Sequence, residues 1–178
     1  MDAPKFAVFS SNLGWIALVW RGRSLVELTF GHPTPGAARR ALNAADAELA
    51  EELPEFAEDW VTRLRDYAEG DHRDDFLDID LDLPGATDFQ VAVLNCCRRI
   101  PAGTVVTYAE LADAAGHPGA ARAVGQVMAT NRFPLVVPCH RVVAAGGLMG
   151  GYSAPQGLDM KERLLREEGI VFSSEQDS

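Results

Sequence analysis

The sequence predicts an α+β fold, in which a small antiparallel sheet with helices comes first and a helical half carrying a single cysteine-histidine pair follows. Residues 1–30 alternate short β-prone runs with Gly-containing turns, and the runs beyond residue 34 have the spacing of helices. At Pro84-Gly85-Ala86 a strongly acidic segment ends and a helical segment begins. We therefore expect two domains, residues 1–84 and residues 85–178.

Composition limits the class of protein. The 178 residues are 47% hydrophobic and 24% charged, which suits a packed core beneath a polar surface. No apolar run reaches the roughly 18 residues of a membrane span, and the N-terminus lacks the basic and apolar parts of a signal peptide. The three cysteines, of which Cys96 and Cys97 are adjacent, fit neither a disulfide framework nor a metal spacing. We expect a cytoplasmic protein without membrane contact, cofactor or metal.

The net charge of −10 argues at first against nucleic acid as a partner. The charge is uneven, because residues 1–85 hold eight Lys/Arg against 17 Asp/Glu, whereas residues 86–178 hold eight against nine. Residues 119–166 hold six basic residues and only two acids. A local basic surface is compatible with binding a polyanion, with strong salt dependence.

The N-terminal half begins with three β-prone runs, residues 5–10, 15–20 and 24–30, whose short turns predict an antiparallel meander. A helix over residues 37–47 follows from the Ala- and Arg-rich composition. A second helix ends at Gly70, and its apolar positions recur with helical spacing: Phe56, Trp60, Leu64 and Tyr67. Residues 76–83 alternate apolar and acidic side chains, which predicts a strand with one wet face.

The C-terminal half predicts four helices. Thr87 caps the first, whose apolar face includes Cys96, and Thr107 caps a short helix over residues 108–115. A slim, Ala-rich helix over residues 120–130 follows a Gly-containing turn, and this pair is typical of a helix-turn-helix that binds DNA. An ordinary helical hairpin in which the alanines allow tight packing explains the same pattern. The closing helix covers residues 158–168, and the polar residues after Phe172 predict a frayed tail.

The segment Val136-Val137-Pro138-Cys139-His140-Arg141-Val142-Val143 is the candidate for chemistry. Its β-branched residues predict a buried strand pair, and Pro138 stiffens the backbone before the cysteine. Positive charge nearby tunes a thiol toward thiolate, so Cys139 is either a nucleophile or only a small buried hydrophobe. A carboxylate from the closing helix, Glu167 or Glu168, would complete a Cys–His–Glu relay.

A helix-turn-helix beside a nucleophile makes sense if the substrate is a group on DNA, and chemistry on a base requires that the base leave the stack. Ordered motifs support this interpretation: Phe89-Gln90, residues 100–108, residues 121–125, Asn131, Pro138-Cys139-His140-Arg141-Val142, Gly151-Tyr152-Ser153 and residues 161–169. The chain thereby resembles the O6-alkylguanine-DNA alkyltransferase, or methylated-DNA–protein-cysteine methyltransferase, family. The specific matches cover about residues 87–170.

The resemblance implies an RNase H-like N-terminal domain and a winged helix-turn-helix C-terminal domain. It implies that Cys139 takes the alkyl group from guanine O6 irreversibly, in a single turnover. His140 would act as base through a water, Glu168 would orient it, and Asn131 would tie the recognition helix to the active-site segment. The implied partner is double-stranded DNA with alkylated guanine, and we expect a monomer.

The resemblance also implies how DNA is held. Arg122 would fill the gap left by the flipped nucleotide, and Thr107 and Ala121 would join it at the DNA surface. Tyr108 would press on a phosphate and donate to guanine N3. The carbonyls of Cys139 and Val142 would recognise the guanine amino group, and Tyr152 and Ser153 would form a lid over the base.

The sequence departs from the family in two places. The lid is two residues longer than is common and has Ala154-Pro155 where glycine is usual, and the N-terminal half lacks the Cys and His ligands of a structural zinc. Two other functions stay open. One is a non-catalytic damage-binding protein similar to the alkyltransferase-like proteins, against which Cys139 speaks, and the other is a small cysteine hydrolase.

Overall fold

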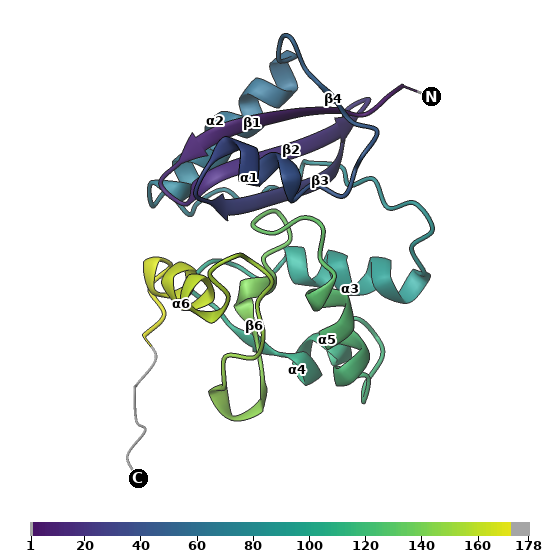
Figure 1. Ribbon diagram of the computed structural model, residues 1–178. Coiled ribbons are helices and arrows are strands. Elements are labelled where there is room, and N and C mark those ends of the chain that lie inside the picture. The colour runs from purple at the N-terminus through teal and green to yellow at the C-terminus, as the bar shows by residue number, and fades with distance from the viewer. Residues whose placement is uncertain (1, 172–178) are drawn as a thin grey trace.

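The computed structural model describes residues 2–171 and confirms the α+β prediction. A four-stranded sheet with two helices forms one layer, and the remaining helices form a second layer beneath it (Figure 1). The tail predicted after Phe172 lies outside the described residues. The RNase H-like and winged descriptions stay predictions.

The sheet has the order β3-β2-β1-β4. Its strands are β1 (Lys5–Ser11), β2 (Gly14–Arg21), β3 (Ser24–His32) and β4 (Glu48–Leu49). The first three pair antiparallel, as the meander prediction required. The short parallel edge strand β4, where Glu48 pairs with Lys5, was not predicted, because two residues carry no periodicity.

The helix predicted over residues 37–47 is shorter in the structure. Helix α1 (Pro35–Arg40) begins after the Thr34 cap and ends at Ala41. The backbone N–H groups of Asn43 and Ala44 then donate to the carboxylate of Glu27 on β3, which replaces the bonds of further helical turns. Helix α2 (Glu55–Ala68) covers the sheet with the predicted apolar face.

The strand predicted over residues 76–83 is wrong, apart from one isolated bridge between Leu81 and Leu25. The side chains of Asp74 and Asp75 accept hydrogen bonds from the N–H groups two residues on, and Phe76 has a positive φ of 54°. The turn that results buries Phe76 and Ile79 but leaves Leu77 exposed, so burial does not follow the alternation of residue types in the sequence.

The second layer contains the remaining elements: α3 (Asp88–Arg98), β5 (Val106–Thr107), α4 (Tyr108–Ala114), α5 (Ala121–Ala129), β6 (Val142–Val143) and α6 (Leu158–Glu167). Thr87 and Thr107 form the capping boxes of α3 and α4, as predicted. The predicted strand pair around Cys139 is wrong on its first side, because residues 134–137 form a turn with only an isolated bridge between Pro134 and Val137. Cys139–Arg141 then form a 3₁₀ turn that leads into β6. In β6, Val142 pairs in parallel with Val106 of β5.

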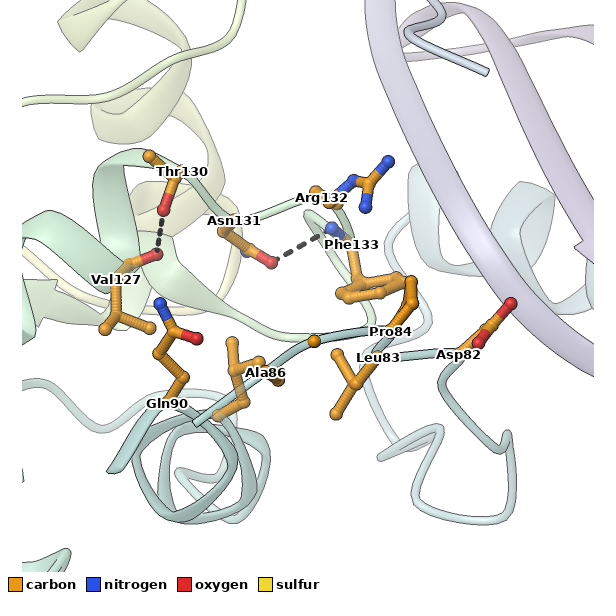
Figure 2. A pocket seen from close by; sticks show the side chains of 12 residues that line it. Asp82, Leu83, Pro84, Ala86, Gln90, Val127, Thr130, Asn131, Arg132 and Phe133 are labelled. Atoms are coloured by element: carbon orange, nitrogen blue, oxygen red, sulfur yellow. Dashed lines mark hydrogen bonds between the residues drawn. The ribbon is translucent and has the colours of Figure 1, made fainter. Parts of the chain in front are cut away.

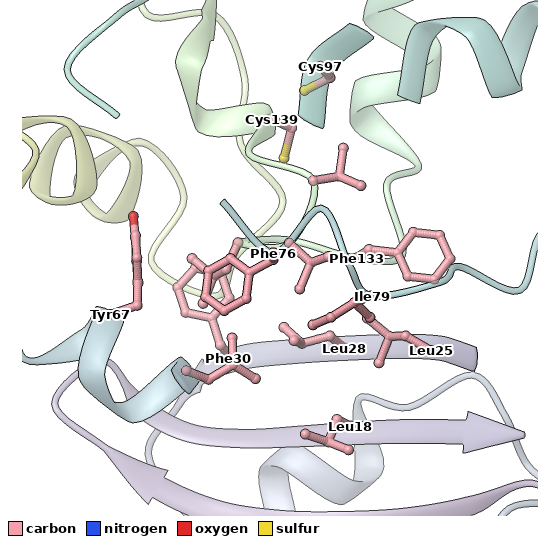
Figure 3. Packing of buried hydrophobic residues seen from close by; sticks show 14 of the residues in the cluster. Leu18, Leu25, Leu28, Phe30, Tyr67, Phe76, Ile79, Cys97, Phe133 and Cys139 are labelled. Atoms are coloured by element: carbon pink, nitrogen blue, oxygen red, sulfur yellow. The ribbon is translucent and has the colours of Figure 1, made fainter. Parts of the chain in front are cut away.

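One hydrophobic core joins the two layers. It runs from Leu18 and Leu28 in the sheet, through Phe76 and Phe133, to Cys139 (Figure 3). Arg98 is buried at the same junction and donates to the carbonyls of Phe76 and Ile79 at 2.8 and 2.7 Å. The position of the cysteine is thus set by packing from both halves of the chain.

Across residues 2–171, the structure contains no helix with the length and apolar character needed to cross a membrane.

Candidate active site

Cys139 begins a 3₁₀ turn at the centre of the second layer, directly after Pro138. Its side chain is buried, and the residue is 5% exposed. Asn131, just beyond α5, fixes this turn: its Nδ2 donates to the Val137 carbonyl at 2.9 Å, and its Oδ1 accepts from Phe133 N at 2.9 Å. The structure therefore joins the end of α5 to the cysteine turn through Asn131.

The Cys139 thiol is protonated in the resting protein. Burial raises its pKa, although a hydrogen bond from Asn131 and the charge of Lys161 act in the opposite direction. The guanidinium of Arg141, the positive charge two residues after Cys139, binds Glu168 and the Ile100 carbonyl. Cys139 therefore needs a base to become a nucleophile.

His140 and Glu168 form a buried pair on the far side of the turn. Nε2 of His140 lies 2.8 and 3.0 Å from the two carboxylate oxygens of Glu168. Burial lowers the pKa of His140, and Glu168 opposes this only partly, so the ring is neutral at pH 7. A carboxylate accepts only, so Nε2 carries the proton and Nδ1 is the unprotonated nitrogen. Nδ1 is buried and has no hydrogen-bond partner among residues 2–171.

Glu168 is held by three groups and has no exposed side-chain surface. Burial alone would raise its pKa, but hydrogen bonds from His140 and Arg141 lower it to about 2. The Arg141 guanidinium donates to both oxygens, with Nε 2.8 Å from Oε1 and an Nη 2.9 Å from Oε2. The Tyr67 hydroxyl of α2 donates to Oε2 at 3.2 Å, so a residue of the N-terminal layer completes the site.

Sequence reasoning missed Tyr67 and Lys161. The sequence pattern predicts Tyr67 only as part of the apolar face of α2, and its hydroxyl is a polar group on that face that could indicate a further role. Lys161 lies on the face of α6 that packs inward, one turn before Leu164 and Leu165, and a lysine on an apolar face was the signal there.

Lys161 is fully buried, and its Nζ donates to three carbonyls. The acceptors are Val142 at 2.7 Å, Met149, and Gly151 at 3.3 Å. Burial lowers the pKa of Lys161 to about 8, and the negative charge of a Cys139 thiolate acts in the opposite direction. Lys161 thus holds the loop over Cys139 and supplies a positive charge to the site.

A cavity of about 270 Å³ opens onto Cys139. Its lining combines α4, α5 and the loop before α6: Tyr108, Gly125, Met128, Ala129, Cys139, Gly151, Tyr152 and Ser153. The hydroxyl of Tyr152 is buried, and none of the described residues bonds to it. The structure therefore places three predicted substrate residues, Tyr108, Tyr152 and Ser153, around one cavity with the cysteine.

The other predicted residues lie nearby in different roles. Val142 is buried below the cavity, and its carbonyl accepts from Lys161. The Thr107 side chain accepts from Glu110 N as the cap of α4. Arg122 is exposed near the start of α5, beside the half-exposed Ala121.

A second hollow, of about 230 Å³, lies between residues 82–86 and the end of α5 (Figure 2). Asn131 and Phe133 line it, but Cys139 does not. Within residues 2–171, no three His, Cys, Asp or Glu side chains come together as a metal site would require. The expectation that the protein needs no metal stays a prediction.

Comparison with known proteins gives consistent results. Residues 88–170 match the family described as 6-O-methylguanine DNA methyltransferase, DNA binding domain. The methylated-DNA–protein-cysteine methyltransferase of Methanosarcina acetivorans is 35% identical over 164 residues, which are 92% of this chain and 97% of that protein. The crystal structure of Mycobacterium tuberculosis OGT in complex with DNA superposes with a TM-score of 0.75 at 33% identity and covers 92% of both chains.

An archaeal structure extends the likeness. The O6-methylguanine-DNA methyltransferase from Pyrococcus kodakaraensis matches with a TM-score of 0.66 at 27% identity, over 94% of this chain and 99% of that one. Both solved structures therefore share the two-layer arrangement along nearly their whole length.

Proposed function

Because this chain belongs to the methylated-DNA–protein-cysteine methyltransferase family, we infer that it repairs alkylated DNA by direct reversal, with Cys139 as the acceptor of the alkyl group. The observation that carries the assignment is the buried Cys139 thiol at the floor of a cavity lined by Tyr108 and Tyr152. A neutral His140, already oriented by Glu168, adjoins that thiol in the chain.

The proposed reaction begins with a proton transfer. Nδ1 of His140 takes the Cys139 proton through a water, and the imidazolium that forms is stabilised by the Glu168 carboxylate. Lys161 stabilises the new thiolate by its charge. The raised pKa of the resting thiol explains why a base is needed.

The thiolate sulfur then bonds to the alkyl carbon as the bond from that carbon to guanine O6 breaks. The electron pair leaves with the guanine, and the Tyr108 hydroxyl at the cavity wall donates a hydrogen bond to N3 of the base. The resulting thioether is stable, so each molecule reacts once.

The cavity requires the alkylated guanine to leave the duplex. Helix α5 is slim and exposed on its Ala-rich side, and Arg122 near its start is the candidate to fill the space in the stack. Thr107 and Ala121 lie at the starts of α4 and α5, where the free backbone N–H groups of a helix N-terminus can donate hydrogen bonds to a DNA phosphate. Double-stranded DNA with O6-alkylguanine is therefore the proposed substrate.

The proposal also covers the domain boundary, the oligomeric state and the location in the cell. A boundary near residue 84 separates the sheet layer from the helical layer, although the core crosses it. A monomer suits a reaction in which each chain contributes its own cysteine. Three unpaired cysteines suit the reducing cytoplasm.

The test is intact-mass measurement after incubation with a duplex that contains O6-methylguanine. We expect one methyl group per protein, located on the peptide with Cys139, and no further gain with excess DNA. Cys139→Ala should bind the duplex equally but gain no mass. DNA binding by the unaltered protein without a mass gain would instead indicate a damage-binding protein. Turnover of an ester without DNA binding would indicate a hydrolase.

A further inference from the structure

We infer that Gln156 restricts the size of the O6-alkyl group that the site accepts, because its side chain ties the lid, residues 150–157, to the N-terminal sheet. The inference rests on the proposed function, since it concerns the substrates of the same site. It concerns the part of the chain in which the sequence departs from the family.

The lid forms one wall of the cavity above Cys139. Gly151, Tyr152 and Ser153 line it, and Lys161 holds the first part of the lid through the Gly151 carbonyl. The Tyr152 ring packs edge-on against Phe30 of β3, with ring centroids 6.4 Å apart. A larger alkyl group must displace the Tyr152 ring, and Phe30 limits movement of that ring toward β3.

Gln156 makes a second contact with the same strand. Its Nε2 donates to the carbonyl of Gly31 at 2.5 Å, across 125 residues of sequence. Gly31 has a φ of +82°, and a Cβ there would lie 2.6 Å from the Gln156 Oε1. A side chain at position 31 would therefore displace the end of the Gln156 side chain, and the positive φ itself favours glycine.

The chain between Tyr152 and Gln156 is short and closed by a turn. Gly157 N donates to the Ala154 carbonyl at 2.8 Å, and Pro155 fixes its own φ within that turn. Because Phe30 blocks movement of the Tyr152 ring toward β3, the ring can yield only along or away from that strand. Such a movement is transmitted through the short turn to Gln156 and lengthens its bond to Gly31. The lid is held by α6 at one end and by β3 at the other.

The hydrogen bond from Gln156 to Gly31 predicts a difference in transfer rate between small and large alkyl groups. A methyl group fits beside the thiol without moving the lid, so its transfer does not depend on the bond from Gln156 to Gly31. A benzyl group requires Tyr152 to move and must break that bond. Losing the bond should raise the benzyl rate relative to the methyl rate by about three- to tenfold, the range for one net hydrogen bond.

The experiment compares second-order rates of adduct formation on Cys139 for O6-methylguanine and O6-benzylguanine in the same duplex sequence. Gln156→Ala removes the side chain, and Gln156→Met keeps its length without the donor. Both variants should raise the benzyl-to-methyl ratio, and hydrogen exchange in residues 150–157 should become faster. Gly31→Ala should act in the same direction, because it displaces Gln156.

Arg163→Ala is the matched control. Arg163 also joins α6 to the sheet layer, by donating to the Asn12 carbonyl at 2.8 Å, but it lies outside the lid. The Arg163→Ala variant should leave unchanged both the benzyl-to-methyl rate ratio and the rate of hydrogen exchange in the lid. An unchanged ratio in both Gln156 variants, or an equal change in Arg163→Ala, would overturn the inference alone. An unaltered protein that gains neither group would overturn the proposed function and the inference together.

Discussion

At the scale of single residues, the buried charge of Glu168 organises the site. It orients His140, neutralises Arg141 and accepts from Tyr67, so one carboxylate binds three side chains from two other segments of the chain. A buried carboxylate is tolerated only when its partners compensate for lost hydration. The hydrogen bonds from His140 and Arg141, which lower the pKa of Glu168 to about 2, supply that compensation.

Replacing this charge should damage both reactivity and stability. Glu168→Gln leaves Arg141 buried without a counter-charge and cannot stabilise the His140 imidazolium. We expect alkyl transfer to slow by about 10²-fold or more and the free energy of unfolding to fall by about 3–5 kcal/mol. Adduct formation by mass and urea denaturation measure the two effects.

Glu167→Gln is the control for this change. Glu167 is the adjacent acid and pairs with Arg163 at the surface. Its replacement should change the free energy of unfolding by less than about 0.5 kcal/mol and leave transfer unchanged. Equal effects at the two positions would contradict the special role of Glu168.

At the scale of elements, the helix caps are where local sequence and final structure agree most closely. The Thr87 side chain accepts from Gln90 N, and the Gln90 side chain accepts from Thr87 N. Two backbone N–H groups at the start of α3 are thus hydrogen-bonded by residues of the same helix start. Helix α4 repeats the arrangement with Thr107 and Glu110. Local hydrogen bonds of this kind depend on residues three apart, which is why the sequence reveals them.

Thr87→Ala should therefore cost stability alone. Loss of the cap should lower the free energy of unfolding by about 1 kcal/mol, while the rate of alkyl transfer stays the same, because α3 does not line the cavity. Thr62→Ala, at an exposed interior position of α2, is the control and should be neutral or slightly stabilising. Chemical denaturation of the two variants measures the difference.

The role proposed for α5 leads to a separate prediction. If Arg122 fills the space that the flipped nucleotide leaves in the base stack, Arg122→Ala should slow alkyl transfer from a duplex about tenfold or more. The same variant should leave transfer from free O6-benzylguanine unchanged. Free base needs no flipping, so the comparison isolates that step. A loss of rate on both substrates would instead mean that the variant disturbs the cavity.

At the scale of the whole molecule, the two layers depend on each other. The cysteine sits in a core shared with the sheet (Figure 3), and Tyr67 reaches Glu168 from the N-terminal layer. Because the core and this hydrogen bond span both layers, unfolding should be cooperative across them.

Acidic groups with lowered pKa values occur in both layers. In the N-terminal layer, Asp74 and Asp78 pair with Arg63 of α2.

The same groups predict acid lability. A carboxyl with a folded pKa below its unfolded value stabilises the fold above the unfolded pKa of about 4.3. That contribution is lost as the pH falls toward the folded pKa, which is about 2 for Glu168. The lowered pKa values of the buried His140 and of His32 add a loss that begins below the unfolded histidine pKa of about 6.5. We therefore expect the free energy of unfolding to fall gradually from pH 7 to about 5 and more steeply from there toward pH 2. Urea denaturation across this range is the measurement, and a flat profile between pH 5 and 3 would contradict it.

Local sequence was enough to predict the meander, the amphipathic helices, the two capping boxes and the Cys139-His140 motif, because each depends on residues close together in the chain. The remaining features depend on packing between segments. Residues 76–83 turn instead of extending, because Asp74 and Asp75 cap local N–H groups and Arg98 binds the carbonyls. Tyr67, Lys161 and the tie from Gln156 to Gly31 join segments that only packing brings together. Periodicity reports which face of an element is buried, whereas a polar partner far along the chain leaves no periodic signal.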